Sequence, residues 1–146
     1  MNEAGTEVKI KLVSSIIPTE GELETYEMWL QGTFVEKTGK PYLRYEEVQE
    51  DKTIRTTVKL TNDQALIMRS GGVNMRLPLN TTQREQGSYE SPYGSLPIET
   101  KTHQLAVELE QGSNVSGRFI TQYDLIIGGT SVGNYTLEIH YSEVQS

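Results

Sequence analysis

Apolar and polar residues alternate along most of this 146-residue chain, a period that is typical of β-strands with one buried face. No window longer than ten residues carries the apolar stripe of an amphipathic helix. The alternation is cleanest at about residues 7–17, 24–36, 53–60 and 134–143, and we count about nine or ten short strands in all. The pattern therefore predicts an all-β protein.

The segment from Ala65 to Leu79 predicts a β-hairpin that turns at Gly71-Gly72, because glycine adopts positive φ angles at no steric cost. Pairing around these two glycines gives one almost wholly apolar face, which we expect to point inward. That face holds Leu66, Met68, Met75 and Leu77. The outward face carries Ile67, Arg69, Asn74, Arg76 and Pro78. A slip of one residue would exchange the two faces of a strand.

Turns at Thr38-Gly39 and at Asp51-Lys52, and a three-residue loop at 61–63, extend this hairpin into a continuous meander. The turns predict three sets of facing residues, which are Phe34 with Leu43, Tyr45 with Val58, and Val58 with Leu66. All of these strands then share one inward face. Agreement between turn chemistry and hydrophobic pattern supports the prediction.

The alternation breaks between Asn80 and Pro97, where we expect a loop or a ragged edge with a turn at Ser91-Pro92-Tyr93-Gly94. The phase of the apolar positions shifts between Thr100 and Leu105, which predicts a β-bulge near 101–103. Further turns are expected at 111–113 and in a long glycine-rich connection at 128–133.

An antiparallel meander of this length accumulates twist and exposes two edges, and closure removes both. We therefore expect a closed or nearly closed up-and-down β-barrel of about 8–10 strands, formed by residues 1–146 as a single domain. A barrel of this size has either a lumen filled by side chains or room for one small ligand.

The net charge of −7 and the pI near 4.9 oppose binding to nucleic acid. The chain contains no cysteine, which excludes disulfides and thiolate chemistry. Its longest apolar run, Leu125-Ile126-Ile127, is too short to span a membrane, and the N-terminal residues do not read as an export signal. We expect a cytoplasmic protein without a cofactor, either a monomer or a homodimer.

The inward face supplies the candidate ligand-binding residues. They are Tyr45, Glu47, Thr56, Met68, Met75, His103 and Tyr123. Glu47 is the most informative, because a carboxylate inside a barrel is desolvated. Desolvation raises its pKa unless a cation or a hydrogen-bond donor contacts it. His103, placed inward opposite Thr121, is the partner that the pattern offers. The alternative is that a bulge turns one of them outward or that Glu47 lies at a wet mouth.

Two surface features also need weighing. Four cations, Arg55, Lys59, Arg69 and Arg76, are expected on one outward face, as a small anion site or as an ordinary solvated surface. Trp29 and Val35 form a possible exposed apolar patch for a protein partner. The histidines at 103 and 140 fall on opposite faces, which argues against a shared metal site.

Three segments occur together in this chain, Pro41 to Glu47, Leu66 to Val73 and Ser91 to Gly94. In this order they resemble the YwiB-like family of small bacterial proteins, over nearly the whole chain. Serine stands at Ser91 where that family would have threonine before Pro-Tyr-Gly. The resemblance implies a calycin-type, lipocalin-like β-barrel from a bacterial cytoplasm, and it implies no activity and no catalytic residue.

The leading hypothesis is a non-enzymatic binder of a small, mostly apolar ligand in the barrel lumen. An enzyme that uses Glu47 and His103 as an acid and base pair is the first alternative. A protein-interaction module that uses the face around Trp29 is the second.

Overall fold

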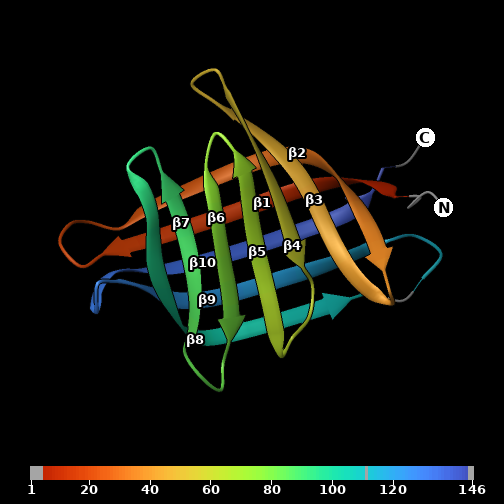
Figure 1. The fold of residues 1–146 in the computed structure, drawn as a ribbon. Coiled ribbons are helices and arrows are strands. Elements are labelled where there is room, and N and C mark those ends of the chain that lie inside the picture. The colour runs from red at the N-terminus through yellow and green to blue at the C-terminus, as the bar shows by residue number, and fades with distance from the viewer. Residues whose placement is uncertain (1–4, 111, 145–146) are drawn as a thin grey trace.

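The computed structural model describes residues 5–110 and 112–144, and these residues form ten antiparallel strands (Figure 1). The strands are β1 (Thr6–Pro18), β2 (Glu24–Lys37), β3 (Lys40–Gln49), β4 (Lys52–Lys59), β5 (Gln64–Gly71), β6 (Asn74–Asn80), β7 (Glu85–Ser91), β8 (Gly94–Leu109), β9 (Ser116–Ile127) and β10 (Thr130–Glu143). The all-β prediction is confirmed. No helix in the described part of the chain is long and apolar enough to cross a membrane.

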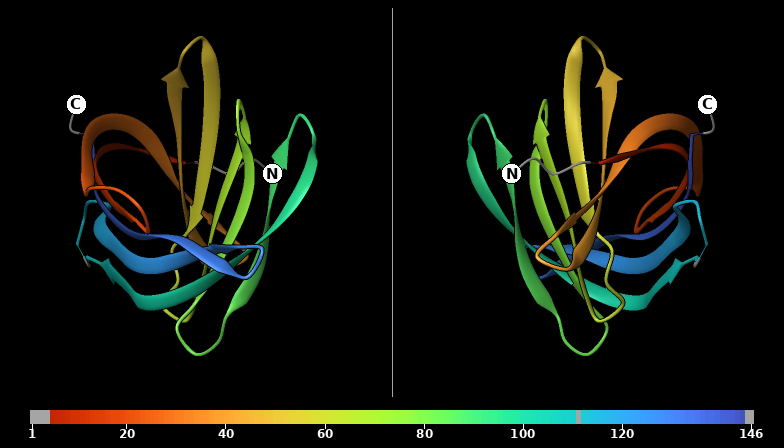
Figure 2. Two further views of the ribbon diagram at one scale, coloured as in Figure 1. Left: turned by 90° about the vertical axis from the view of Figure 1, so that its left-hand side faces the viewer. Right: turned by 90° about the vertical axis from the view of Figure 1, so that its right-hand side faces the viewer.

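Each strand pairs with its neighbours in sequence, and β1 closes the barrel by pairing with β10 from Val8↔Glu143 to Pro18↔Gly133. The predicted closed up-and-down topology is therefore confirmed. The barrel is flattened into two layers, with β3 to β7 crossing over β8, β9, β10 and β1 (Figures 1 and 2). The inward side chains of both layers project into the space between them.

Two of the predicted tight turns set the registers of β2, β3 and β4. Thr38 and Gly39 have φ angles of 48° and 78°, and the turn aligns Phe34 with Leu43 as expected. The next turn is at Glu50-Asp51 instead of Asp51-Lys52, with φ angles of 47° and 70°. Tyr45 consequently faces Thr56 and not Val58, a shift of two residues that leaves every side chain on its predicted face.

The predicted register of the β5–β6 hairpin is wrong by one residue. Met68 lies opposite Arg76, and Arg69 lies opposite Met75. The inward face of β5 therefore holds Ala65, Ile67 and Arg69, while Met68 is 47% exposed on the outside. Both faces of this strand carry apolar residues, so periodicity alone does not decide between them. The loop before it is one residue longer than predicted, which pairs Val58 with Ile67 and produces the change of phase.

Three other predictions concern the second half of the chain. Residues 85–91 form strand β7 and not a loop, although β6 pairs with it only over residues 74–76. The predicted bulge is confirmed, since the β8–β9 register shifts between Thr102 and Gln104. The connection from β9 to β10 is a tight turn at Gly128-Gly129 followed by a bulge, shorter than expected. Gln111, in the predicted 111–113 turn, lies outside the described residues.

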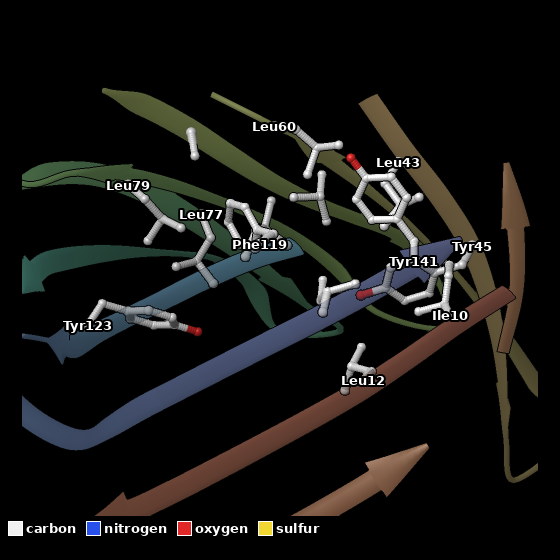
Figure 3. Close-up of a cluster of buried hydrophobic side chains, with 14 of the residues drawn as sticks. Ile10, Leu12, Leu43, Tyr45, Leu60, Leu77, Leu79, Phe119, Tyr123 and Tyr141 are labelled. Carbon is white, nitrogen blue, oxygen red and sulfur yellow. The ribbon is translucent and has the colours of Figure 1, made fainter. Parts of the chain in front are cut away.

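The packed core occupies the end of the barrel where β2 joins β3 and β4 joins β5. Leu43, Val58, Leu60 and Phe119 are at most 2% exposed there, and Phe34 stacks on Tyr141 with ring centroids 5.8 Å apart. Figure 3 shows the buried side chains projecting from both layers toward each other. Burial of this kind contributes roughly 1.5–3 kcal/mol for each large apolar side chain.

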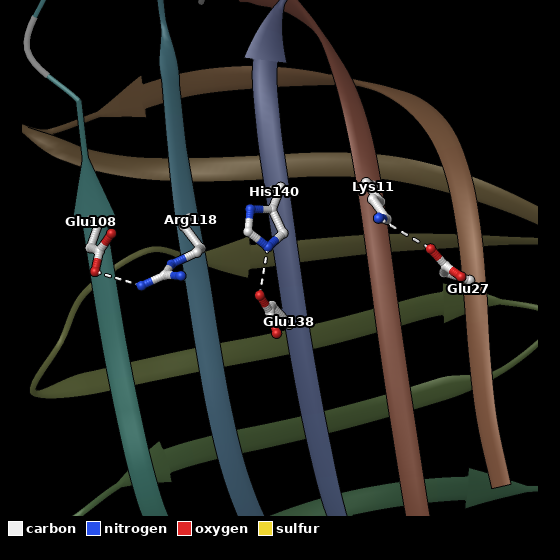
Figure 4. Close-up of polar contacts among 6 residues, drawn as sticks. All are labelled: Lys11, Glu27, Glu108, Arg118, Glu138 and His140. Carbon is white, nitrogen blue, oxygen red and sulfur yellow. Dashed lines mark hydrogen bonds and ion pairs between the residues drawn. The ribbon is translucent and has the colours of Figure 1, made fainter.

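The outer face of β8, β9, β10, β1 and β2 is covered by charged pairs (Figure 4). Arg118 contacts Glu108 at 2.8 Å, His140 contacts Glu138 at 2.6 Å, and Lys11 contacts Glu27 at 3.2 Å. All of these side chains are more than one third exposed, so each pair contributes at most about 1 kcal/mol. They make this face of the sheet compatible with water.

Gly71 provides a test of the observed path of the β5–β6 hairpin. Its φ angle is +99°, and a Cβ placed there would overlap the Thr53 carbonyl oxygen of β4. Gly39 also has a positive φ angle, +78°, but a Cβ there meets nothing within 4 Å. We expect Gly71→Ala to lower the free energy of unfolding by about 3 kcal/mol and Gly39→Ala by about 1 kcal/mol in urea titrations. Equal losses would contradict this path.

Candidate functional site

A cavity of about 560 Å³ lies inside the barrel at the end opposite the packed core. Because strand direction alternates, the β1–β2, β3–β4, β5–β6, β7–β8 and β9–β10 turns all lie at this end. The polar lining residues sit close to those turns, with Glu47 and Gln49 at the end of β3 and Arg69 at the end of β5. The barrel is therefore a cup, closed by its core at one end and hollow at the other.

The cavity reaches the surface where β2 separates from β3. The two strands pair only from Gly32↔Tyr45 to Lys37↔Lys40, so residues 24–31 of β2 pair with β1 alone. Thr25, Tyr26, Glu27 and Met28 line the cavity on that side, facing Glu47 and Gln49 on β3. The unpaired part of β2 therefore forms one boundary of the cavity.

The main polar feature inside the cavity is an ion pair between Arg69 and Glu47. Arg69 Nη2 lies 3.7 Å from Glu47 Oε2, and the two side chains are 25% and 8% exposed. Gln49 Nε2 donates a hydrogen bond of 3.1 Å to the same carboxylate oxygen. The β3 and β5 registers place both charged groups on the inward face.

Tyrosines form the walls around this pair. Tyr123 stacks on Tyr135 with ring centroids 5.3 Å apart and planes 5° from parallel. Burial raises the pKa of the Tyr45 and Tyr123 hydroxyls, Glu47 adds to this at Tyr45, and the charge of Arg69 opposes it at both. These phenols therefore stay neutral at physiological pH and offer hydroxyl groups. Thr56 Oγ1 is buried, and its interaction with the Tyr45 hydroxyl lowers the pKa of that group against the larger effect of burial.

Most of the remaining lining is apolar. Leu12, Met28, Ile67, Leu77 and Leu137 contribute most of the apolar wall. A volume between about 300 and 1,000 Å³, an apolar lining and a few convergent polar groups are usual for small-molecule sites. Among the described residues, no group of three or more His, Asp and Glu side chains is arranged to hold a metal ion.

The structure brings most of the predicted lumen residues together. Tyr45, Glu47, Thr56, Met75 and Tyr123 all line the cavity. Met68 does not, because of the register of β5. His103 was also expected inside and lies outside.

His103 is the extra residue of the β8 bulge, between Thr102 and Gln104, and this turns its side chain outward. Its Nε2 lies 2.8 Å from Asp124 Oδ2. Asn134 Nδ2 donates a hydrogen bond of 2.8 Å to the other oxygen of Asp124. Burial raises the pKa of Asp124, but these two contacts outweigh it and hold the pKa below its usual value. The predicted Glu47 and His103 pair is not formed.

Arg69 is the site residue that the sequence prediction missed. It was placed outward with Arg55, Lys59 and Arg76, so that group of four cations does not exist as predicted. One signal could have found it: a carboxylate predicted inside a barrel needs a cation on a neighbouring inward face. Only the alternative phase of β5 supplies one.

The proposed apolar patch is also changed. Trp29 is 69% exposed, but Val35 is buried at 3%. The Lys11 ammonium lies over the Trp29 ring, 5.8 Å from its centroid, so a positive charge contacts this face of the indole. The exposed feature is therefore a single tryptophan beside a lysine.

The chain is similar to the uncharacterized beta-barrel protein YwiB of Bacillus subtilis (strain 168), with 29% identity over 129 residues that cover 88% of this chain and 89% of the relative. Its structure matches the crystal structure of the ywiB protein from Bacillus subtilis with a TM-score of 0.82 and 26% identity, over 97% of this chain and 94% of that one. The resemblance inferred from the three sequence segments is confirmed.

The family described as a domain of unknown function, DUF1934, matches residues 10–139. This range includes every strand of the barrel at least in part, and all of the residues that form the Arg69–Glu47 pair. The chain therefore belongs to the DUF1934 family.

Proposed function

We propose that this protein binds a small, mostly apolar molecule in the barrel lumen without transforming it. The observation that carries the proposal is a paired Arg69 and Glu47 inside a mostly apolar cavity of about 560 Å³. The aliphatic wall would take up the body of the ligand, and the charged pair with the tyrosine hydroxyls would fix its orientation. The net charge of −7 and the lack of cysteine support a cytoplasmic setting with no nucleic-acid partner.

The cost of the charged pair supports a role in binding. Taking two charges out of water is expensive, and well-packed apolar residues of similar volume are often as stable or more stable. Leucine and methionine at these positions would simply extend the apolar lining. A pair that the core does not need is best explained by recognition of a polar group.

The two alternatives have less support. An acid and base pair of Glu47 and His103 has no geometric basis, because the side chains lie on opposite sides of the barrel wall. An interaction surface around Trp29 would not include Val35, because Val35 is buried. The lumen remains the site with the best combination of volume, lining and charge.

Uptake of a neutral apolar dye tests the proposal. Nile red should bind saturably, one molecule per chain, with an increase in fluorescence. Met75→Trp should weaken this uptake, because Met75 lines the cavity and the bulkier indole would take up part of the space that the dye needs.

Met68→Trp is the matched control, since Met68 lies on the neighbouring strand with its side chain outside. This variant should bind Nile red as the wild type does, and the thermal melts of both variants should show cooperative unfolding. Absence of saturable uptake by the wild-type protein, or equal loss in both folded variants, would contradict the proposal.

A double-mutant cycle tests whether the ion pair serves stability. Glu47→Leu leaves the Arg69 cation without its partner and should lower the free energy of unfolding by about 1–3 kcal/mol. Adding Arg69→Met should restore it to within about 1 kcal/mol of the wild type, because the unpaired cation is then removed from the cavity. Urea titrations measure all four proteins. A double variant as unstable as the sum of the single changes would show that the two groups are not coupled.

A further inference from the structure

The side chain of Arg69 has an unused capacity to bind an anion. An arginine carries five N–H donors in a planar fork. In the described part of the chain, the acceptor found for them is Glu47 Oε2, and its distance of 3.7 Å is longer than a hydrogen bond. The guanidinium therefore has donors to spare inside the cavity, where an apolar ligand alone would not satisfy them.

The surroundings of Arg69 favour an acceptor with carboxyl geometry. Arg69 lines the same cavity as Tyr45 on β3 and Tyr123 on β9, and its charge acts on both hydroxyls. Thr56 Oγ1, on β4, is buried and interacts with the Tyr45 hydroxyl. A guanidinium binds a carboxylate through two parallel hydrogen bonds, and such bonds are about twice as strong as neutral ones.

A second carboxylate would upset the charge balance of this site. Arg69 and Glu47 neutralise each other, so an ionised ligand would leave a net negative charge in the cavity of a chain whose net charge is already −7. Two carboxyl groups that share one site do not both ionise readily, and one of them keeps a proton. The bound ligand and Glu47 would then hold one proton between them, with Arg69 donating to both.

The other ionisable groups that face the Arg69–Glu47 pair do not take up this proton in place of Glu47 and the ligand. Tyr45 on β3, Tyr123 on β9 and Tyr135 on β10 have pKa values raised by burial, and hydrogen bonding to Glu24 raises that of Tyr26 on β2. All four stay neutral. Glu27, at the rim, is paired with Lys11 at 3.2 Å. Glu47 is thus the carboxylate that lies beside Arg69 inside the cavity.

We propose, on the basis of the lumen function above, that the ligand is an amphipathic molecule with a single carboxyl group, and that it binds with uptake of one proton. Its carboxyl group accepts hydrogen bonds from Arg69 and shares the proton with Glu47. Its apolar part lies against Leu12, Met28, Ile67, Leu77 and Leu137. No covalent bond is made or broken, and the proton comes from solvent.

Isothermal titration calorimetry with decanoate, decan-1-ol and decylammonium tests this inference. In two buffers of different ionisation enthalpy, decanoate should bind at pH 6 with close to one proton taken up per chain. Its affinity should be at least tenfold lower at pH 8. Decan-1-ol should bind with no dependence on pH, and decylammonium should bind most weakly.

Three variants separate the roles of the two charged groups. Arg69→Met should weaken decanoate at least tenfold at pH 6 and leave decan-1-ol unchanged. Glu47→Gln should abolish proton uptake and strengthen decanoate at least tenfold at pH 8. Arg76→Met is the matched control, because Arg76 is an exposed arginine on the adjacent strand, and it should change neither ligand. Thermal melts confirm that each variant is folded.

The outcomes distinguish this inference from the proposed function. If decanoate binds no more tightly than decan-1-ol, or if folded Arg69→Met binds it normally, the carboxyl assignment is overturned while lumen binding stands. Decanoate binding without proton uptake, or with an unchanged pH dependence in Glu47→Gln, overturns the shared proton. If neither decan-1-ol nor Nile red binds to the wild-type protein, the lumen function itself fails.

Discussion

A sheet that closes on itself allows each side chain only two directions, into the barrel or out to water. This constraint governs the structure, because β1 pairs with β10 from Val8↔Glu143 to Pro18↔Gly133 and closes the sheet into a barrel. A change of one residue in the phase of a strand exchanges its two faces completely. The site depends on that exchange, since it brings Arg69 to the inside beside Glu47.

The fold could be predicted from the sequence because its determinants are local. Period-two alternation identified most of the strands, and paired residues that tolerate positive φ fixed turns such as Thr38-Gly39. The phase of β5 could not be predicted, because Leu66 and Met68 on one face compete with Ala65 and Ile67 on the other. That choice depends on the length of the preceding loop and on contacts with β4, which are not local.

The residues of the site could be predicted on those strands whose phase was predicted correctly. Glu47, Tyr45 and Thr56 were placed inside because β2, β3 and β4 have tight turns and unambiguous patterns. His103 was misplaced because a bulge shows in the sequence as a change of phase without saying which residue is extra. Arg69 was missed because of the phase of its strand. The structure thus places an arginine, and not a histidine, beside Glu47.

The phase of β5 is the claim on which the account of the lumen rests, and the absence of cysteine makes it directly measurable. Ile67→Cys and Met68→Cys each introduce a single thiol on adjacent residues, which are 6% and 47% exposed in the structure. With a water-soluble maleimide, the thiol at position 68 should react at least about tenfold faster than the one at position 67 in the native protein, and equally fast in urea. A faster reaction at position 67 would place Arg69 outside the barrel and contradict the account.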